Sequence, residues 1–275
     1  MSNIKIITDS SSYITKEYAE REKVTIVPLN YVFGEEIGKE PFPGEFNEFY
    51  HKLSNTKLFP STSQPAAGDF LDVFNKAFEE GYDEVIAILL SSKLSGTFNS
   101  AMLAKNMLED KRVTIIDSLS AASNLRFLVE DAVDMAKEGK SSEEIEAHIN
   151  AKKLNMHIYL TTDTLEYLSR GGRLSAVQAT VGNLLNIKPI IELKDGELKL
   201  LEKLRGKNKA LSAIVDKVPA NVQKIGICHA LDIEDAEKLK GILIEKFPNT
   251  IISVDELGPV IGAHLGTGGI GICLY

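Results

Sequence analysis

Short apolar runs alternate with amphipathic helical patterns through the first half of the chain. Runs typical of buried strands occupy residues 3–8, 24–29, 31–37, 84–90 and 112–117. Helical patterns occupy residues 69–81 and 98–110, between the later runs. Strands that alternate with helices are typical of a mainly parallel, doubly wound α/β sheet. We predict such a sheet for the N-terminal half.

Residues 118–153 are predicted to form two helices, separated by a break at Gly139. Ser141 or Ser142 is the expected N-cap of the second helix, because serine hydroxyls accept hydrogen bonds from the first free N–H groups of a helix. No strand-like run lies in this stretch. We therefore place a domain boundary near residue 154.

The second half of the chain shows a different order of strand-like and helical patterns. Asp195-Gly196 stands between two β-rich runs, which is a strong signal for a hairpin and hence for antiparallel pairing. Further strand-like and helical patterns alternate at residues 157–161, 222–230, 233–247, 249–257 and 270–275. We predict a mixed α/β layer here and two domains, residues 1–154 and 155–275. They are expected to pack tightly, with a ligand crevice between them.

Composition and charge narrow the class of protein. The 275 residues are 44% hydrophobic and 25% charged, which excludes disorder as the main state. A net charge of −8 repels phosphate backbones and anionic lipids, so we expect no nucleic-acid partner. No apolar run approaches about 18 residues, and the first residues lack a secretory pattern, so we expect a cytoplasmic protein without stable membrane insertion. Cys228 and Cys273 lie in apolar runs without CxxC spacing and are predicted to be buried thiols.

Motifs with a known catalytic mechanism are missing or out of context. The segment from Gly34 to Glu40 is one residue short of a phosphate-binding loop and lacks its hydroxyl residue. The glycine run 266–271 precedes a strand instead of following one, so it is no dinucleotide fingerprint. GxSxG and HExxH are absent, and the five histidines lack metal-ligand spacing. We predict no metal, no cofactor and no catalytic residue.

Three hydroxyl-rich segments suggest an anion site instead. Thr62 and Ser63 stand before Pro65, a residue favoured at the start of helices, where free N–H groups attract a carboxylate. Ordinary capping by Ser63 or Gln64 is the alternative for this segment. The other two segments follow strands, and their polar residues are Ser10 in the first and Ser91, Ser92, Ser95, Gly96 and Thr97 in the second. The carboxyl ends of parallel strands meet at one edge, so these segments can converge there.

Cations and one histidine are further candidates. Arg170 and Arg173 flank a glycine pair and suit a planar anion, although a solvated loop is equally compatible. His264 lies among glycines that let backbone approach a ligand, with a structural histidine as the alternative. A cluster of cations stands at a predicted helix start, where the macrodipole disfavours them, and comprises Lys203, Arg205, Lys207 and Lys209. This cluster fits either an anionic partner or a solvated patch.

Together these segments resemble the DegV family. The motifs are TDSSS, PSTSQP, SSKLSGTFNSA, YLSRGGRL followed by KPI, LRGKNKA and GPVIGAHLGTGGIG, in this order between residues 8 and 271. The last one departs from the family, which more usually has proline where Thr267 stands. The resemblance implies two α/β domains with a long-chain fatty acid between them. It also implies a non-catalytic subunit that presents the fatty-acid carboxylate to a separate ATP-dependent kinase subunit, and the acyl phosphate then enters phospholipid synthesis.

The same resemblance assigns roles to residues. Those expected to bind the carboxylate are Thr62, Ser63, Ser95, Gly96 and His264. Those expected to face the head group or the kinase are Ser10, Thr97, Arg170, Arg173 and Arg205. The alternative is an enzyme, a serine-dependent hydrolase of acyl esters or thioesters that uses Ser95 with His264.

Overall fold

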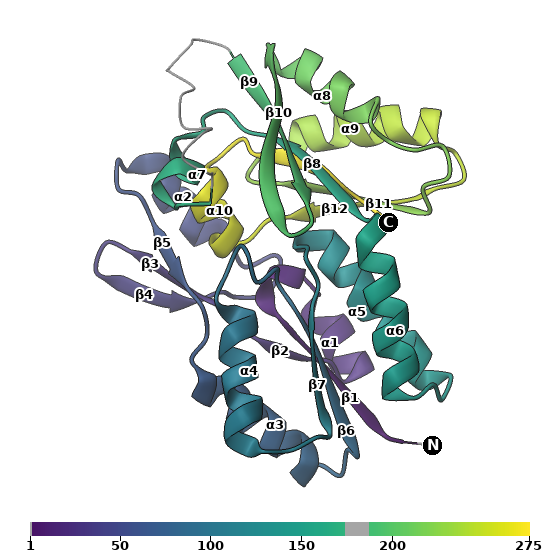
Figure 1. The fold of residues 1–275 in the computed structure, drawn as a ribbon. Coiled ribbons are helices and arrows are strands. Elements are labelled where there is room, and N and C mark those ends of the chain that lie inside the picture. Colours follow the sequence, from purple (N-terminus) through teal and green to yellow (C-terminus); the bar gives the residue numbers. More distant parts are fainter. Residues whose placement is uncertain (1, 174–186) are drawn as a thin grey trace.

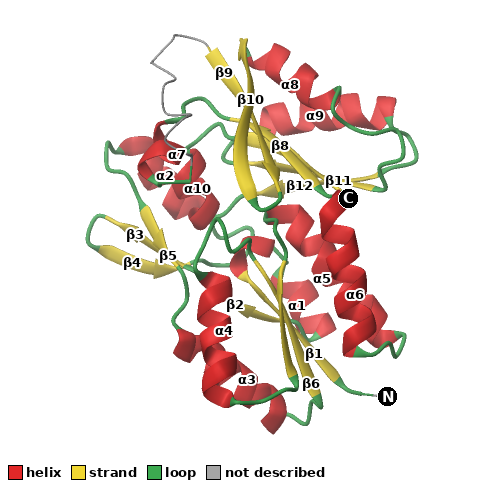
Figure 2. Cartoon of the chain, viewed as in Figure 1, coloured by secondary structure: helices red, strands yellow, loops and turns green. Residues whose placement is uncertain are grey.

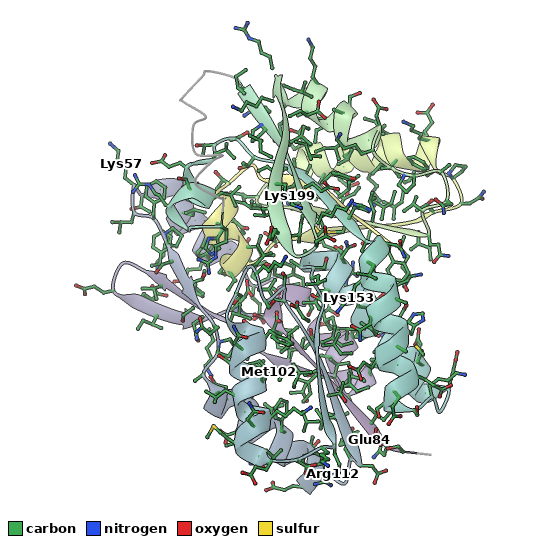
Figure 3. All side chains as sticks on the ribbon, in the orientation of Figure 1. Lys57, Glu84, Met102, Arg112, Lys153 and Lys199 are labelled. Carbon is green, nitrogen blue, oxygen red and sulfur yellow. The ribbon has the colours of Figure 1, made fainter. Side chains whose placement is uncertain are left out.

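The computed structural model describes residues 2–173 and 187–275. Two α/β units are stacked on one another, the N-terminal unit below and the C-terminal unit above in Figure 1. Side chains of both units extend into the region between them (Figure 3). The predicted domain boundary falls at the short helix η2 (Lys153–Asn155), and the division into two domains stays a prediction.

The lower unit is built on a parallel sheet with strand order β2-β1-β6-β7. Its strands are β1 (Ile4–Asp9), β2 (Thr25–Val27), β6 (Glu84–Leu89) and β7 (Val113–Asp117). All neighbouring pairs run parallel. The central strands β1 and β6 are buried almost throughout, which explains why they read as continuous apolar runs in the sequence.

Helices cover both faces of the parallel sheet (Figure 2). On one face α3 (Ala67–Glu79) and α4 (Thr97–Leu108) pack against strand residues such as Ile7. On the other lie α1 (Lys16–Glu22), α5 (Ala122–Lys137) and α6 (Ser142–Lys152). The predicted doubly wound sheet is thus confirmed.

The upper unit contains a mixed sheet with strand order β10-β9-β8-β13-β11-β12. These strands are β8 (His157–Thr161), β9 (Ile187–Lys194), β10 (Glu197–Arg205), β11 (Lys224–His229), β12 (Ile251–Glu256) and β13 (Ile270–Leu274). Only β11 and β12 pair in parallel. Helices α8 (Lys207–Val215) and α9 (Ile233–Lys246) cover one face. The other face turns toward the lower unit, so the mixed α/β prediction is confirmed.

Two predicted features of local backbone are confirmed. Gly139 has a φ of 78° and ends α5, and Ser141 caps α6 in a reciprocal pair with Glu144. Asp195 and Gly196 both have positive φ, of 53° and 82°, as a two-residue hairpin turn of type I′ requires. They join β9 to β10.

A small antiparallel sheet was not expected from the sequence. The run 31–37, predicted as one strand, is a hairpin of β3 (Asn30–Phe33) and β4 (Glu36–Lys39). Gly34, with a φ of 66°, makes the turn, and the apolar residues on both sides had hidden it. The third strand, β5 (Ser61–Ser63), pairs with β3.

The predicted helix start at Pro65 is also wrong in detail. Helix α3 begins at Ala67, and its N-cap is Ala66, whose N–H donates to Asp69 Oδ2 at 2.9 Å. Neither Ser63 nor Gln64 caps it. Thr62 and Ser63 lie in β5 instead, where pairing with β3 fixes the directions of their side chains.

Three short helices complete the layer between the two units. They are α2 (Asn47–Asn55), α7 (Glu166–Arg170) and α10 (Pro259–Leu265). The 3-10 helix η1 (Ser10–Ser12) follows β1 at the carboxyl edge of the parallel sheet. A buried cluster of apolar side chains from both units surrounds these helices.

Candidate functional site

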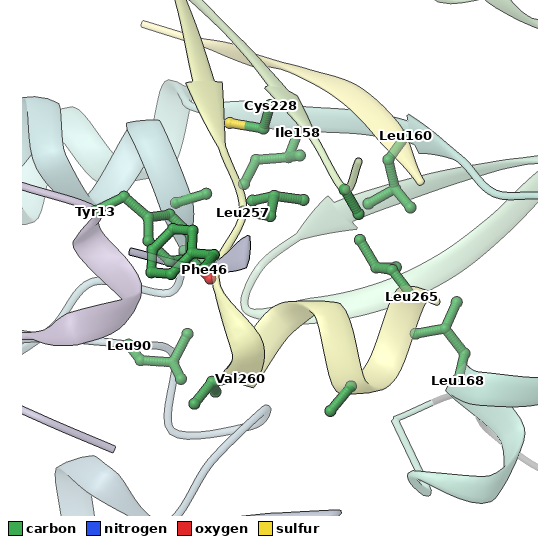
Figure 4. Close-up of a cluster of buried hydrophobic side chains, with 14 of the residues drawn as sticks. Tyr13, Phe46, Leu90, Ile158, Leu160, Leu168, Cys228, Leu257, Val260 and Leu265 are labelled. Atoms are coloured by element: carbon green, nitrogen blue, oxygen red, sulfur yellow. The ribbon is translucent and has the colours of Figure 1, made fainter. Parts of the chain in front are cut away.

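An apolar cavity lies between the parallel sheet's carboxyl edge and the mixed sheet. The centre of a water-sized sphere can move through about 100 Å³ of this cavity, and the whole space between its walls, open solvent included, is about 850 Å³. Figure 4 shows Leu90 and Val260 on one side of this region, and Ile158, Leu160 and Cys228 of the mixed sheet on the other. Lining residues therefore come from segments far apart in the sequence.

Helix α10 forms one wall of the cavity. Val260, Ile261 and Leu265 line the cavity, and so does His264. Tyr50 of α2 donates a hydrogen bond of 2.6 Å to the Leu257 carbonyl just before this helix. Gly262 of α10 lies directly on the Tyr50 ring, where a side chain would collide. These contacts hold the wall against the lower unit.

Four of the polar side chains that line the cavity are Thr62, Ser95, Arg173 and His264. The Thr62 hydroxyl and His264 Nε2 share a hydrogen bond of 2.9 Å. Arg173 Nε donates to the Leu94 carbonyl at 3.0 Å, next to Ser95. The remaining walls are mostly aliphatic. The arrangement suits a ligand with one polar end and a long apolar part.

The electrostatics of this polar set favour a neutral histidine. Burial, and to a smaller extent the positive charge of Arg173, lower the pKa of His264 to about 4. His264 Nδ1 is buried and has no hydrogen-bond partner among the described residues. Burial also lowers the pKa of the Arg173 guanidinium from its usual value. An anion placed here would offset the positive charge of Arg173.

Two glycines allow close packing around the polar set. Gly171, after α7, lies against His264, and a Cβ there would stand 2.1 Å from Nδ1. Gly96, the residue before α4, does not line the cavity and lies against the side chain of Gln64. A Cβ at Gly96 would stand 2.9 Å from that amide carbon. Each glycine thus brings two segments together beside the site.

The remaining predicted carboxylate ligands lie differently. Ser63 is exposed and points away from the cavity, with its hydroxyl 3.5 Å from Asn30 Nδ2. This follows from strand alternation, because Thr62 next to it faces inward. Thr97, which was expected to face the head group or the kinase, is buried, and its hydroxyl bonds to Ser95 Oγ at 2.8 Å. Of the carboxylate ligands expected from the sequence, three therefore line the cavity: Thr62, Ser95 and His264.

The hydroxyl-rich segment after β1 does not contribute hydroxyl groups to the cavity. This differs from the prediction that all three hydroxyl-rich segments converge on one site. Ser10 Oγ donates to Glu40 Oε2 at 2.6 Å and accepts from the Leu29 N–H at 3.0 Å. Ser11 Oγ donates to Asp9 Oδ1 at 2.5 Å. These serines serve the local structure, since a buried carboxylate needs such donors.

The predicted cations lie outside the cavity, Arg173 excepted. Arg170 is exposed, pairs with Glu166 at 2.8 Å and stacks 4.0 Å over the ring of Phe59. Arg205 is exposed at the end of β10. Lys207 lies in an ion pair with Asp232 and is 3.0 Å from Asp235. The basic cluster is therefore split between β10 and α8, and Lys207 is already neutralised.

Glu40 is a site-related residue that the sequence did not reveal. It is fully buried, and Oε1 accepts from the Val260 N–H at 2.8 Å, which ties β4 to α10. Burial raises the pKa of its carboxyl to about 7. No local pattern could indicate this contact, because its partners are 220 residues apart.

Both cysteines are buried, as predicted, and both line the cavity. Within residues 2–173 and 187–275, no group of three or more histidine, cysteine or acidic side chains could hold a metal ion. Among the described helices, none is long and apolar enough to cross a membrane.

The fold and the cavity define a class of protein, namely a two-layered α/β protein with an apolar cavity between its sheets. A family model described as "Uncharacterised protein, DegV family" matches residues 3–275. The chain belongs to the DegV family. It is 35% identical to the protein DegV of Bacillus subtilis over 277 residues, which cover 98% of either chain. It is also 38% identical to a DegV domain-containing protein of Halalkalibacterium halodurans, over 100% of this chain and 99% of the relative.

Solved structures of relatives share the whole fold. DegV of Bacillus subtilis, described as a fatty acid binding protein, aligns with a TM-score of 0.88 at 34% identity. A DegV family protein of Thermus thermophilus, described by its fatty acid binding, gives 0.90 at 32% identity. Both alignments cover 100% of this chain and 99% of the other.

Proposed function

We propose that this protein binds a long-chain fatty acid in the cavity, with the carboxylate at Thr62, Ser95 and His264. The observation that carries the proposal is the polar set in an otherwise aliphatic cavity. The fatty-acid binding described for the Bacillus subtilis and Thermus thermophilus structures supports it. Burying about 14 methylenes contributes about 11 kcal/mol gross, against an association cost of about 4 to 15 kcal/mol. The acyl chain supplies the affinity.

The polar set gives the ligand its orientation. A carboxylate in an apolar cavity is costly unless hydrogen-bond donors reach it. The Thr62 and Ser95 hydroxyls and the His264 ring are such donors, and Arg173 adds a positive charge. Ser63 and Gly96 do not line the cavity, so we propose indirect roles for them. Ser63 holds β5 in place by pairing with β3. Gly96 lets the Gln64 side chain approach the start of α4.

We further propose that the protein is a non-catalytic subunit of a cytoplasmic fatty-acid kinase system that feeds phospholipid synthesis. A separate ATP-dependent subunit would phosphorylate the carboxylate. Uncharged donors leave the carboxylate reactive, and phosphoryl transfer depends chiefly on positioning. Arg170 and Arg205 are exposed and available to a partner, whereas Ser10 and Thr97 are buried and act on local structure.

The contacts of Ser95 and His264 favour a carrier over a hydrolase. A serine nucleophile needs a hydrogen bond to a histidine base that a third group orients. Here His264 Nε2 bonds to Thr62, and Ser95 bonds to Thr97. Ser95→Ala distinguishes the two functions: a carrier loses affinity for fatty acid, whereas a hydrolase keeps binding and loses ester turnover.

Mass spectrometry of the purified protein tests the proposal, first under native conditions and then after denaturing extraction. We expect one free fatty acid per chain, released only on denaturation. The same measurement on Ser95→Ala should show a lower occupancy. A protein that is isolated empty and that also fails to take up added palmitate or oleate would refute fatty-acid binding.

A further inference from the structure

The two cysteines of the chain meet in the wall of the cavity. Cys228 of β11 and Cys273 of β13 have their sulfur atoms 3.6 Å apart, and both line the cavity. Across the antiparallel ladder, Cys228 stands opposite Gly271 and Cys273 opposite Gly226. A glycine opposite each cysteine leaves room for the two thiols to reach one another diagonally. They are the only cysteines in the sequence.

A chain of hydrogen bonds leads from this thiol pair to a carboxylate. Ser123 Oγ donates to Asp255 Oδ2 at 2.8 Å, so its single proton is already used. The contact of 3.0 Å between Ser123 Oγ and Cys228 Sγ is therefore donated by the Cys228 thiol. Since the single proton of the Cys228 thiol is used in that contact, the contact between the two sulfur atoms is donated by the Cys273 thiol. The proton of Cys228 thus has a path through Ser123 to Asp255.

The two thiols are not equivalent. The hydrogen bond from Cys273 lowers the pKa of the Cys228 thiol from its usual value, against burial. Once Cys228 has lost its proton, the Ser123 hydroxyl can turn to the thiolate, and this contact lowers the pKa in the same direction. Burial raises the pKa of the Cys273 thiol well above its usual value. Thiolates are the reactive form of cysteine, so Cys228 is the better nucleophile and Cys273 the better resolving thiol.

We propose that Cys228 and Cys273 form a dithiol site that reduces hydroperoxides in the cavity. The Cys228 sulfur attacks one oxygen of the O–O bond, which stays on the sulfur as a sulfenic acid. The other oxygen takes the thiol proton and leaves as an alcohol, or as water when hydrogen peroxide is the substrate. The Cys273 thiol then displaces water and forms the Cys228–Cys273 disulfide. In sum, one hydroperoxide and two thiols give one alcohol, one water and one disulfide. The substrate is hydrogen peroxide or the hydroperoxide of an unsaturated acyl chain, and the acyl case rests on the proposed fatty-acid binding.

The test treats the reduced, delipidated full-length protein with hydrogen peroxide or with the hydroperoxide of linoleic acid, at equal concentrations. Samples are quenched with N-ethylmaleimide, and intact masses count the free thiols. Because the sequence has two cysteines, an intramolecular disulfide can join only this pair. We expect loss of both thiols with either oxidant, and one alcohol formed per chain with the linoleic acid hydroperoxide. If the cavity concentrates the lipid, its hydroperoxide reacts roughly tenfold faster or more. Equal rates would assign hydrogen peroxide as the substrate.

Variants separate the roles of the three groups. Cys273→Ser should stop at a sulfenic acid that dimedone traps, and Cys228→Ser should consume hydroperoxide far more slowly than the parent. Ser123→Ala keeps both thiols, and we expect its rate profile to move to higher pH because the proton path is lost. Uptake of oleate, measured on each variant, reports on folding and on the proposed function separately. Thiols that stay free until the chain is unfolded in urea would overturn the proposal, whether or not oleate binds.

Discussion

At the scale of single residues, the neighbours Thr62 and Ser63 show how strand geometry decides which residue of a motif faces the cavity. Both carry hydroxyls in β5, yet Thr62 contacts His264 inside the cavity and Ser63 is exposed. Thr62→Val keeps the shape and removes the donor. We expect affinity for oleate to fall roughly 10- to 100-fold, since a hydrogen bond to a charged group is lost. Displacement of a fluorescent fatty acid measures this loss.

Ser63→Ala is the matched control in the same strand. Its affinity should stay within roughly twofold of the parent, because surface changes of this kind cost little. Equal losses in both variants would contradict the proposed orientation of the carboxylate.

Glu40 contributes to the pH dependence of stability. Its pKa is raised by burial from 4.5 to about 7, so the folded state holds a proton that the unfolded state releases between these values. Its contribution to stability is complete below pH 4.5 and is lost as the pH rises through about 7, by about 3 kcal/mol. Glu40→Gln keeps an oxygen that accepts from the Val260 N–H, but it carries no titrating proton. The fall in the free energy of unfolding with rising pH should therefore be smaller in this variant. Urea unfolding between pH 4.5 and 8 should show a flatter stability curve.

Glu35→Gln is the control, because it removes the same charge from an exposed turn next to β4. The flattening should be specific to Glu40→Gln. Parallel curves for the parent and Glu40→Gln would mean that the carboxyl does not titrate in this range. Asp9, with its pKa raised by burial to about 6, contributes a slope of the same sign in all three proteins.

The site could be predicted from the sequence where a motif places a residue directly at the end of an element. Ser95 and His264 are examples, and both line the cavity. Ser10 was assigned wrongly, because its hydroxyl serves Glu40, and Glu40 depends on a contact with Val260. Contacts over such separations arise from packing of whole elements, which no local pattern records.

At the scale of elements, the packing of α7 against α10 positions the histidine. Gly171 lies directly on His264, so Gly171→Ala must push the imidazole out of place. We expect at least a roughly tenfold weaker affinity for oleate, because the bond between His264 and Thr62 is broken. Titration calorimetry with the purified variant measures the change.

Two other glycines provide controls for this substitution. Gly172 has a φ of 69° and no neighbour within 4 Å, so Gly172→Ala tests backbone strain without the collision. Gly68, in α3, has open space around it and an ordinary φ. Gly68→Ala therefore introduces neither backbone strain nor a collision, and its affinity for oleate serves as the baseline. If Gly172→Ala weakened binding as much as Gly171→Ala, strain after α7 would explain the effect instead of contact with His264.

Element boundaries were harder to predict than element types. The alternation of strands and helices was correct because buried parallel strands require apolar runs. The start of α3 was wrong because the Asp69 carboxylate caps Ala66, whereas the hydroxyls before Pro65 take part in strand pairing. A hydroxyl before a proline is compatible with both structures, and only the partner strand β3 decides between them.

At the scale of the whole molecule, the two units depend on one another through the cavity and through a buried contact. Arg126 of α5 donates to Asp255 of β12 at 2.5 Å, and both side chains are largely buried. Breaking such a pair by removing one partner costs about 3 to 5 kcal/mol when it is fully buried. Unfolding of one unit would therefore expose a large apolar surface and a charge on the other.

Thermal unfolding with and without oleate tests this dependence. A ligand that binds only the folded state stabilises it by about 2.7 kcal/mol at 100 times its Kd. For a chain of this size, that corresponds to an increase in Tm of about 5 °C. Because residues from both sheets line the cavity, we expect one transition that moves as a whole. Thr62→Val at the same oleate concentration should move less. Two transitions, of which only one responds to oleate, would instead mean that a single unit holds the fatty acid by itself and that the other merely covers it.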